Sequence, residues 1–213
     1  MKEIIIDRKH EAYEPLKAMQ KLADNKRKTD KKGTQKGLHY IHYNGEIGRF
    51  EASDGRALLT FWWSPEELEG VRSALFEFKN GMLTDSEETY YFPEFRRVIP
   101  EIGGEYNSYG ERFENIYEIT PYEFGQICPA DYRLCTVLGD FGIAINGIYA
   151  GLVRDILPRF SFMALAVTEN GGINTRDWAI MLHGGGMEYV IMPMISGWNR
   201  IPAEVPERLK RGA

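Results

Sequence analysis

The sequence predicts an α+β fold in which helices pack on antiparallel sheets. Alternating apolar runs joined by Asn-Gly turns or Gly-rich turns predict β-hairpins in both halves of the chain. Apolar residues at helical spacing occur in two short segments, 13–22 and 146–157. The chain has 213 residues, of which 43% are hydrophobic, so it can bury one large core or two smaller ones. Because each half holds one helical segment and several hairpins, we expect two related domains.

In the first half, local signals place the ends of each element. Pro15 fits the first turn of a helix, and Asn44-Gly45 fits the turn of a hairpin. Residues 64–67, Ser-Pro-Glu-Glu, have the form of a capping box that begins a short helix. The expected elements are a strand at 4–6, a helix at 13–22, a hairpin of 38–43 with 47–52, a buried strand at 57–63, the short helix after 64, and a hairpin of 75–78 with 82–84.

A segment with a proline near each end closes this half. In residues 92–100, Phe-Pro-Glu-Phe-Arg-Arg-Val-Ile-Pro, both prolines favour an extended backbone and exclude a helix interior or a central strand. The segment is either an ordinary closing loop or a junction where apolar residues pack and arginines reach outward. Residues 101–112 are rich in glycine and polar residues, as linkers are.

The second half predicts a strand at 141–145 and a helix that Asn146 caps and Pro158 ends. We expect the inner face of this helix to carry Ile148, Leu152, Val153 and Ile156. A second capping box at 120–123 predicts another short helix, and strands are expected at 161–167, 178–182 and 189–194. We therefore predict one domain over 1–104, a shortened second domain over 105–195 and a tail over 196–213.

Charge is distributed unevenly along the chain, although its net value is −5. Between Lys21 and Lys36 there are seven basic residues against two acidic ones, whereas acidic residues concentrate in 64–118. Such a basic segment is either a solvated loop or a surface that contacts phosphates. The sequence alone leaves both interpretations open.

The sequence lacks the signals that are typical of several classes of protein. No apolar run is long enough to span a membrane, and no signal peptide is visible, so a cytoplasmic protein is expected. Cys128 and Cys135 are spaced neither as CxxC nor as part of a four-ligand set, so we expect reduced core residues. His39 and His42 would face opposite sides of a strand and so could not bind one metal together. His183 begins a His-Gly-Gly-Gly segment like that of esterases, but no Gly-x-Ser-x-Gly elbow accompanies it, so a hairpin turn is expected. We expect no catalytic residues, no metal and no cofactor.

Three segments form a set: Ala-Ser-Asp-Gly-Arg-Ala-Leu at 52–58, the proline-bounded segment 92–100, and Tyr-Val-Ile-Met-Pro-Met at 189–194. They resemble three signature segments of the bacterial DNA polymerase III beta subunit, the sliding clamp. They occur in the order that the family has in its second and third domains. The resemblance implies a DNA clamp-like fold, with helices facing a central hole, sheets outside, and domains closed into a ring around double-stranded DNA by a homo-oligomer.

The resemblance also implies roles for particular residues. A sliding ring contacts phosphates and not bases, so its DNA-facing helices need basic side chains. The expected DNA contacts are Lys17, Lys21, Lys26, Arg27, Lys28, Lys31, Lys32, Lys36, Arg154 and Arg159. In the family the three signature segments form a groove for a peptide motif of DNA polymerases or clamp loaders. Carried over, that groove is Ser53, Gly55, Leu58, Pro93, Arg97, Val98, Val190, Met192, Pro193 and Met194.

Two departures from the family pattern bear on this function. The family has His-Arg-Leu after Asp-Gly, whereas this chain has Arg56-Ala57-Leu58, and the family ends soon after Met-Pro-Met, whereas this chain continues to Ala213. Met192 and Met194 can also be ordinary core residues. The sequence thus supports a sliding-clamp-like processivity factor for DNA replication. Its alternative is a clamp-derived protein-interaction module, phage or mobile-element encoded, that does not encircle DNA.

Overall fold

A computed structural model of the protein describes residues 3–94, 134–137, 143–166 and 179–192. The chain forms two compact units. The first holds Met1–Glu94 together with Gly186–Tyr189, and the second holds Phe95–Gly185 and Val190–Ala213. The predicted domain boundaries at 104–105 and 195–196, the linker at 101–112 and the capping box at 120–123 lie outside the described residues. The three-part division therefore stays a prediction.

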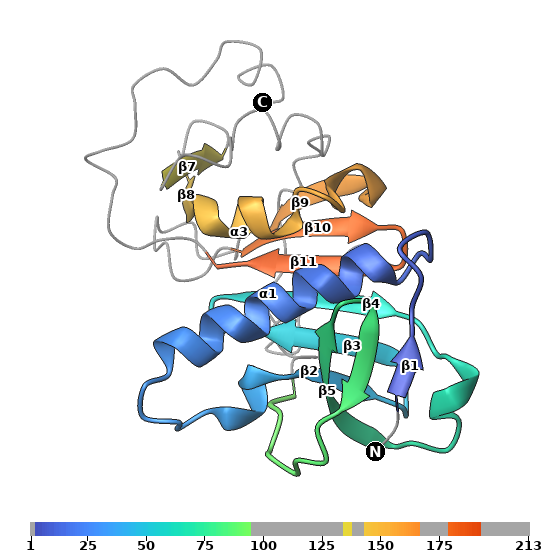
Figure 1. The fold of residues 1–213 in the computed structure, drawn as a ribbon. Coiled ribbons are helices and arrows are strands. Elements are labelled where there is room, and N and C mark those ends of the chain that lie inside the picture. The colour runs from blue at the N-terminus through green and yellow to red at the C-terminus, as the bar shows by residue number, and fades with distance from the viewer. Residues whose placement is uncertain (1–2, 95–133, 138–142, 167–178, 193–213) are drawn as a thin grey trace. The chain divides into compact units, whose positions relative to one another are not determined.

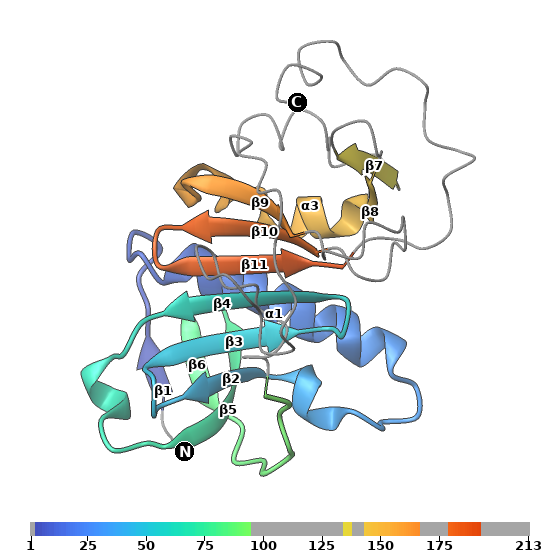
Figure 2. The ribbon, with the colours of Figure 1, turned by 180° about the vertical axis from the view of Figure 1, so that it is seen from behind.

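The first unit consists of one antiparallel sheet and a long helix. Its elements are β1 (Glu3–Ile5), α1 (Tyr13–Thr29), the 3-10 helix η1 (Lys36–His39), β2 (Ile41–Asn44), β3 (Arg49–Ser53), β4 (Ala57–Trp62), the 3-10 helix η2 (Glu66–Leu68), β5 (Ser73–Lys79) and β6 (Met82–Asp85). These strands are ordered β1-β6-β5-β2-β3-β4. Figures 1 and 2, seen from opposite sides, show α1 lying across one face of this sheet.

The core of the first unit lies between α1 and the sheet. Strand pairing sets Phe50 beside both Tyr43 and Phe61, which puts the three rings on one face. Leu16 and Met19 of α1 are fully buried, and α1 packs against β3 and β5. Burial of one such side chain contributes roughly 1.5–3 kcal/mol, so this apolar layer is the main source of stability in the unit.

Gln20 is a polar residue within this layer, and both polar atoms of its side chain form hydrogen bonds there. Its Oε1 accepts a hydrogen bond of 2.7 Å from the backbone amide of Phe78 in β5, and its Nε2 donates to Asp24 at 2.9 Å. Phe78 also meets the ring of Tyr13 edge-on, with centroids 5.4 Å apart. These contacts fix where α1 crosses the sheet.

Most elements predicted for the first half are confirmed. The opening strand, the helix with Pro15 in its first turn, both hairpins and the buried strand β4 all form. The turn at 79–81 has the left-handed backbone that Asn-Gly favours, with φ of 54° at Asn80 and 80° at Gly81. The 44–45 turn differs: Asn44 is still paired with Arg49, and the loop runs over 45–48. Glycine is required at position 45 for another reason: a Cβ there would lie 1.7 Å from the carbonyl oxygen of Val71.

Three predictions for the first half are wrong in detail. Residues 38 and 39 belong to η1 and not to a strand. The segment 64–67 forms no capping box, because Pro65 occupies the cap position and the turn that follows is a short 3-10 helix. The helix predicted over 13–22 continues to Thr29, since Ala23 and the polar residues after it are compatible with helix.

The second unit is described in parts. Its elements are β7 (Leu134–Val137), β8 (Ile143–Asn146), α3 (Gly147–Val153), the 3-10 helix η3 (Leu157–Arg159), β9 (Phe162–Ala166), β10 (Ala179–Gly184) and β11 (Met187–Ile191), whose first residues belong to the first unit. β7 pairs with β8, and β10 pairs with β9, both antiparallel. Cys135 lies in β7, and Cys128 lies outside the described residues.

The cap predicted at Asn146 is confirmed, because its Oδ1 accepts a hydrogen bond of 3.0 Å from the amide of Ile148. The helix is shorter than predicted and ends at Val153, before η3. Ile156 is buried as expected, but Ile148 is 52% exposed and does not belong to the inner face. The predicted turn between β10 and β11 forms at Gly185 and Gly186, and Gly184 is the last residue of β10. Within the described ranges, no helix is both long and apolar enough to span a membrane.

The apolar layer can be tested with Phe50→Ala. Phe50 is fully buried and contacts the rings of Tyr43, Trp63 and Phe76, so its truncation should lower the free energy of unfolding by about 3–5 kcal/mol. Urea denaturation followed by circular dichroism measures this change. Ile5→Ala is the matched control, because Ile5 is 87% exposed; its effect should stay within about 0.5 kcal/mol. Equal effects of the two substitutions would contradict this account of the core.

Candidate nucleic-acid interface

The basic segment is partly helical. Because α1 ends at Thr29, Lys26, Arg27 and Lys28 form its last turn, and only Lys31 and Lys32 lie in the loop that follows. The helix predicted from the sequence ends at residue 22, so the helical start of the basic segment was not predicted. Cations in the last helical turn are favourable because the helix dipole is negative there.

The loop after α1 is held in one shape by Asp30. Its Oδ1 accepts hydrogen bonds from the amide and hydroxyl of Thr34, both 3.1 Å long, and its Oδ2 accepts one of 2.8 Å from the amide of Gln35. His39 Nε2 lies 3.2 Å from the same Oδ2. The bond from Gln35 is the chief cause that lowers the pKa of Asp30 to about 2. Lys31 and Lys32 thus extend from a structured turn.

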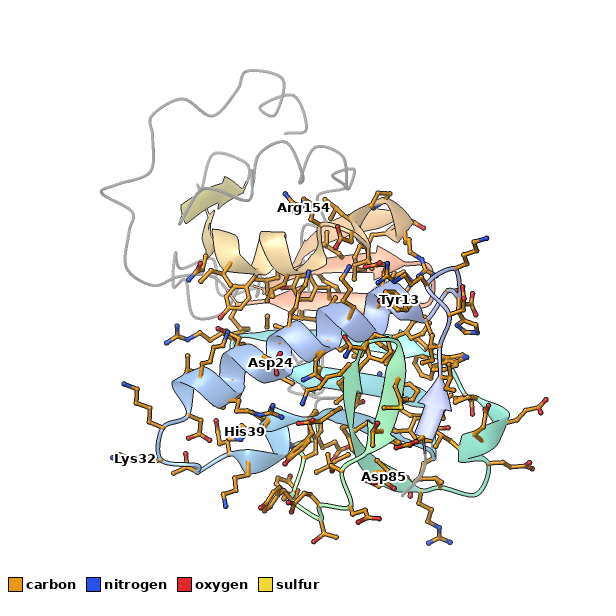
Figure 3. The ribbon with its side chains drawn as sticks, in the orientation of Figure 1. Tyr13, Asp24, Lys32, His39, Asp85 and Arg154 are labelled. Carbon is orange, nitrogen blue, oxygen red and sulfur yellow. The ribbon has the colours of Figure 1, made fainter. Side chains whose placement is uncertain are left out.

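Three lysines in the last turn of α1 and the loop directly after it are exposed and make no ion pair with any described residue. They are Lys28, Lys31 and Lys32. Figure 3 shows Lys32 within the loop after α1, directed away from the rest of the first unit. Exposed cations without carboxylate partners are available to phosphates.

Other basic residues of α1 are engaged within the unit. Arg27 Nη2 contacts Glu77 at 2.5 Å and donates to the carbonyl of His39 at 2.9 Å. Lys17 pairs with Glu14 at 2.9 Å, and Lys26 donates a hydrogen bond to the Gln35 side chain. Arg27 therefore joins α1 to β5 and η1, a structural role that charge counting did not reveal.

The remaining predicted DNA contacts are more scattered. Lys21 is half-buried on α1, and Lys36 begins η1 with its Nζ 5.2 Å from the Tyr90 ring centroid. In the second unit, Arg154 is exposed at the end of α3 and is labelled in Figure 3, and Arg159 is half-buried at the end of η3.

The first signature segment forms a tight turn between β3 and β4. Asp54 Oδ1 accepts hydrogen bonds from the amides of Arg56 and Ala57, at 2.9 and 3.0 Å. Its Oδ2 accepts a bond of 2.6 Å from Asn25 Nδ2 on α1. Gly55 has φ of 88°, a conformation that favours glycine. The contact with Asn25, to which no sequence motif pointed, connects this turn to the basic end of α1.

The predicted groove residues have different surroundings. Ser53 and Leu58 are buried in the first unit, at 2% and 3% exposure, and Pro93 is half-buried. In the second unit Val190 is buried, whereas Met192 is 42% exposed and so is not a core residue. Arg97, Val98, Pro193 and Met194 lie outside the described residues.

A buried charged network, which the sequence analysis missed, occupies the sheet of the first unit. Arg49 and Glu51 are 5% and 3% exposed, and Arg49 Nε donates to Glu51 Oε1 at 2.9 Å. His42 Nδ1 lies 3.1 Å from Glu51 Oε2. Burial opposes ionisation of Glu51, but the hydrogen bonds with His42 and Arg49 outweigh it and lower its pKa.

Glu188 of the 186–189 segment extends this network. Its Oε2 accepts a hydrogen bond of 3.2 Å from Thr60 Oγ1 and lies 3.7 Å from Arg49 Nη1. His39 and His42 have separate partners, Asp30 and Glu51. Among the residues that the structure describes, no group of three or more His, Cys, Asp or Glu side chains is placed to hold a metal ion.

Comparison with known proteins identifies the fold. It is the fold of the DNA polymerase III beta sliding clamps, so the α+β clamp-like class and the resemblance noted in the sequence are confirmed at this level. The Caulobacter crescentus beta sliding clamp matches with a TM-score of 0.53 at 13% identity, over 90% of this chain and 65% of that chain.

Two further clamps match similarly. The Helicobacter pylori beta clamp, solved with 3,4-difluorobenzamide, has a TM-score of 0.51 at 10% identity, and the Bartonella birtlesii clamp, solved with griselimycin, has 0.50 at 12%. Each match covers 90% of this chain and 65% of the other. The chain thus spans about 65% of the length of these clamps. By sequence it matches no family model and no curated protein.

Asp30 gives a prediction about pH. Its pKa is lowered to about 2 from 3.8, so its carboxylate stabilises the loop above pH 3.8, and this contribution is lost as the pH falls through about 2. Amide hydrogen exchange of Thr34 and Gln35 should accelerate, relative to core amides, across that interval. Asp30→Asn should remove this pH dependence. A wild-type loop whose relative exchange does not change between pH 4 and about 2 would contradict the assignment.

The buried network gives a prediction about stability. Glu51→Gln leaves the Arg49 guanidinium buried beside a neutral amide, which should lower the free energy of unfolding by about 3–5 kcal/mol. The double variant Arg49→Met with Glu51→Leu removes both charges and should recover much of that loss. Chemical denaturation measures both. If the double variant is less stable than Glu51→Gln, the hydrogen bonds of Arg49 and Glu51 stabilise the fold beyond balancing each other's charge.

Proposed function

We propose that this protein is a sliding-clamp-like DNA polymerase processivity factor that encircles duplex DNA without sequence specificity and acts without catalysing a reaction. In this role it is a cytoplasmic homo-oligomer that takes part in DNA replication. It docks peptide motifs of a DNA polymerase or clamp loader through its signature residues. The observation that carries the proposal is the basic end of α1, defined by Lys28, Lys31 and Lys32, in a chain with the clamp fold.

Three features support phosphate contact at this basic end. The lysines are exposed and make no ion pair within the described part of the chain. Asp30 holds the loop in shape, so less conformational entropy is lost when a phosphate binds. The protein is acidic overall, with a net charge of −5, which disfavours DNA binding elsewhere on its surface.

A second candidate function follows from length. The match covers about 65% of the solved clamps, and this part of the fold can serve as a protein-interaction module that does not encircle DNA. Molar mass by light scattering at low and moderate salt separates the two candidates. A stable oligomer favours the ring, and a monomer at every concentration favours the module.

The phosphate contacts are tested by charge reversal. Replacing Lys28, Lys31 and Lys32 by Glu should reduce duplex binding. The plot of log affinity against log salt should also become shallower, by the amount that the loss of about three phosphate contacts predicts. The control replaces Arg8, Lys9 and Arg72, which are exposed elsewhere in the first unit, and gives the same change in net charge. Fluorescence anisotropy on labelled duplex measures both variants. Equal losses would refute a local contact surface.

Peptide docking is tested at Met192, which is 42% exposed. Griselimycin is bound in the Bartonella birtlesii clamp structure, and it serves here as the probe. If the signature residues of this chain bind such ligands, Met192→Glu should weaken griselimycin by about tenfold or more, because it places a charge in an apolar contact. Titration calorimetry measures this, with Met82→Glu, at another exposed methionine, as the control. Unchanged affinity in both variants would exclude Met192 from the contact.

A further inference from the structure

A stack of cations and aromatic rings lies beside η1, which no role given above explains. The rings of Tyr40 and Tyr90 are stacked, with centroids 6.3 Å apart and an angle of 27°. Arg27 Cζ lies 5.6 Å from the Tyr40 centroid, and Lys36 Nζ lies 5.2 Å from the Tyr90 centroid. Cations attract aromatic faces at such distances. We call these four residues the tyrosine column.

Tyr91 follows the column directly, and its side chain is exposed to solvent. The residue is 80% exposed, although its backbone is packed. A Cβ on Gly37 would lie 2.0 Å from the Tyr91 carbonyl oxygen, so only glycine permits this approach. On the other side, the ring of Phe92 stacks on His42 with centroids 4.5 Å apart. The packed Tyr91 carbonyl and the stacked Phe92 ring therefore hold the backbone of Tyr91 in place, while the Tyr91 ring stays in water.

We propose that Tyr91 and the tyrosine column bind single-stranded nucleic acid, with a base stacked on the Tyr91 ring and the adjoining phosphates near Lys36. Stacking on an exposed aromatic ring suits any base, and a nearby cation neutralises the backbone. The bases of a duplex are already stacked on each other, so this arrangement selects unpaired strands. The proposal concerns a different ligand from the duplex of the proposed function and does not rest on it.

The surroundings of the column favour nucleic acid over a peptide. Hot spots for protein partners are anchors in well-packed, desolvated pockets, whereas the Tyr91 ring is exposed and follows a column that ends in a lysine. Carboxylates in this region oppose an anion, and exposed Glu87 and Glu94 lie in the same segment as Tyr91. Glu77 is held by Arg27 and Lys79, each at 2.5 Å, and Glu88 is exposed and, after burial, is the next cause that raises the pKa of Tyr40. Neutralising Glu88 should therefore strengthen binding.

The test uses the full chain and a short fluorescein-labelled oligo-dT strand, followed by fluorescence anisotropy. Tyr91→Ala should weaken binding by about tenfold or more, and Tyr91→Phe, which keeps the ring, should stay within about twofold of wild type. Glu88→Gln should bind more tightly than wild type. Ile5→Ala removes an exposed apolar side chain from β1 and should change nothing. Because the Tyr91 ring is in water, thermal unfolding of Tyr91→Ala should match that of wild type.

A labelled duplex provides the second arm. Tyr91→Ala should leave duplex affinity unchanged, whereas reversal of Lys28, Lys31 and Lys32 should reduce it. Equal loss of oligo-dT and duplex binding in Tyr91→Ala would overturn selection for single strands. No binding of oligo-dT by wild type, or full binding by Tyr91→Ala, would overturn the site and leave Tyr91 to a protein partner. If oligo-dT binds in a way that depends on Tyr91 but no duplex binds, the proposed duplex contact is refuted and the Tyr91 site is supported.

Discussion

The buried pair of Arg49 and Glu51 is the constraint on which the arrangement of the first unit depends. A guanidinium and a carboxylate lose their hydration when they are buried, so each needs several well-placed partners. Strand register supplies them: pairing of β2 with β3 sets His42 beside Glu51, and pairing of β3 with β4 sets Thr60 beside Glu51. A shift of β3 by one residue would send Arg49 and Glu51 to the apolar face. The pair thus specifies one sheet alignment.

The opposite face of the same sheet is apolar and carries α1, so the two faces impose different requirements on one set of strands. Alternation along β3 satisfies both, with Phe50 and Ala52 toward the helix and Arg49 and Glu51 away from it. At its far end, α1 is tied to the turn after β3 through Asn25 and Asp54. The basic residues and the first signature segment therefore share one rigid framework.

The sequence predicts much of this fold because its local signals are strong. Asn-Gly turns and alternating apolar residues locate the hairpins, and the cap at Asn146 is where its side chain predicts it. Local signals predict the wrong structure where tertiary contacts determine the conformation or the burial of a residue. Residues 38 and 39 have strand-like neighbours but form η1, and Ile148 has helical spacing but stays in solvent. Among the candidate site residues, charge counting located the basic segment but did not separate exposed Lys31 and Lys32 from Arg27, whose carboxylate partner is 50 residues away.

The inclusion of residues 186–189 in the first unit affects how the protein folds during synthesis. Residues 1–94 leave the ribosome first and already contain α1 and strands β1 to β6. Glu188, which accepts the hydrogen bond from Thr60, is translated roughly 5 to 20 s after residue 94 at typical elongation rates. In that interval β4 has a free edge to which other nascent chains can pair. The edge of β4 is therefore the last part of the first unit to gain its hydrogen-bond partners.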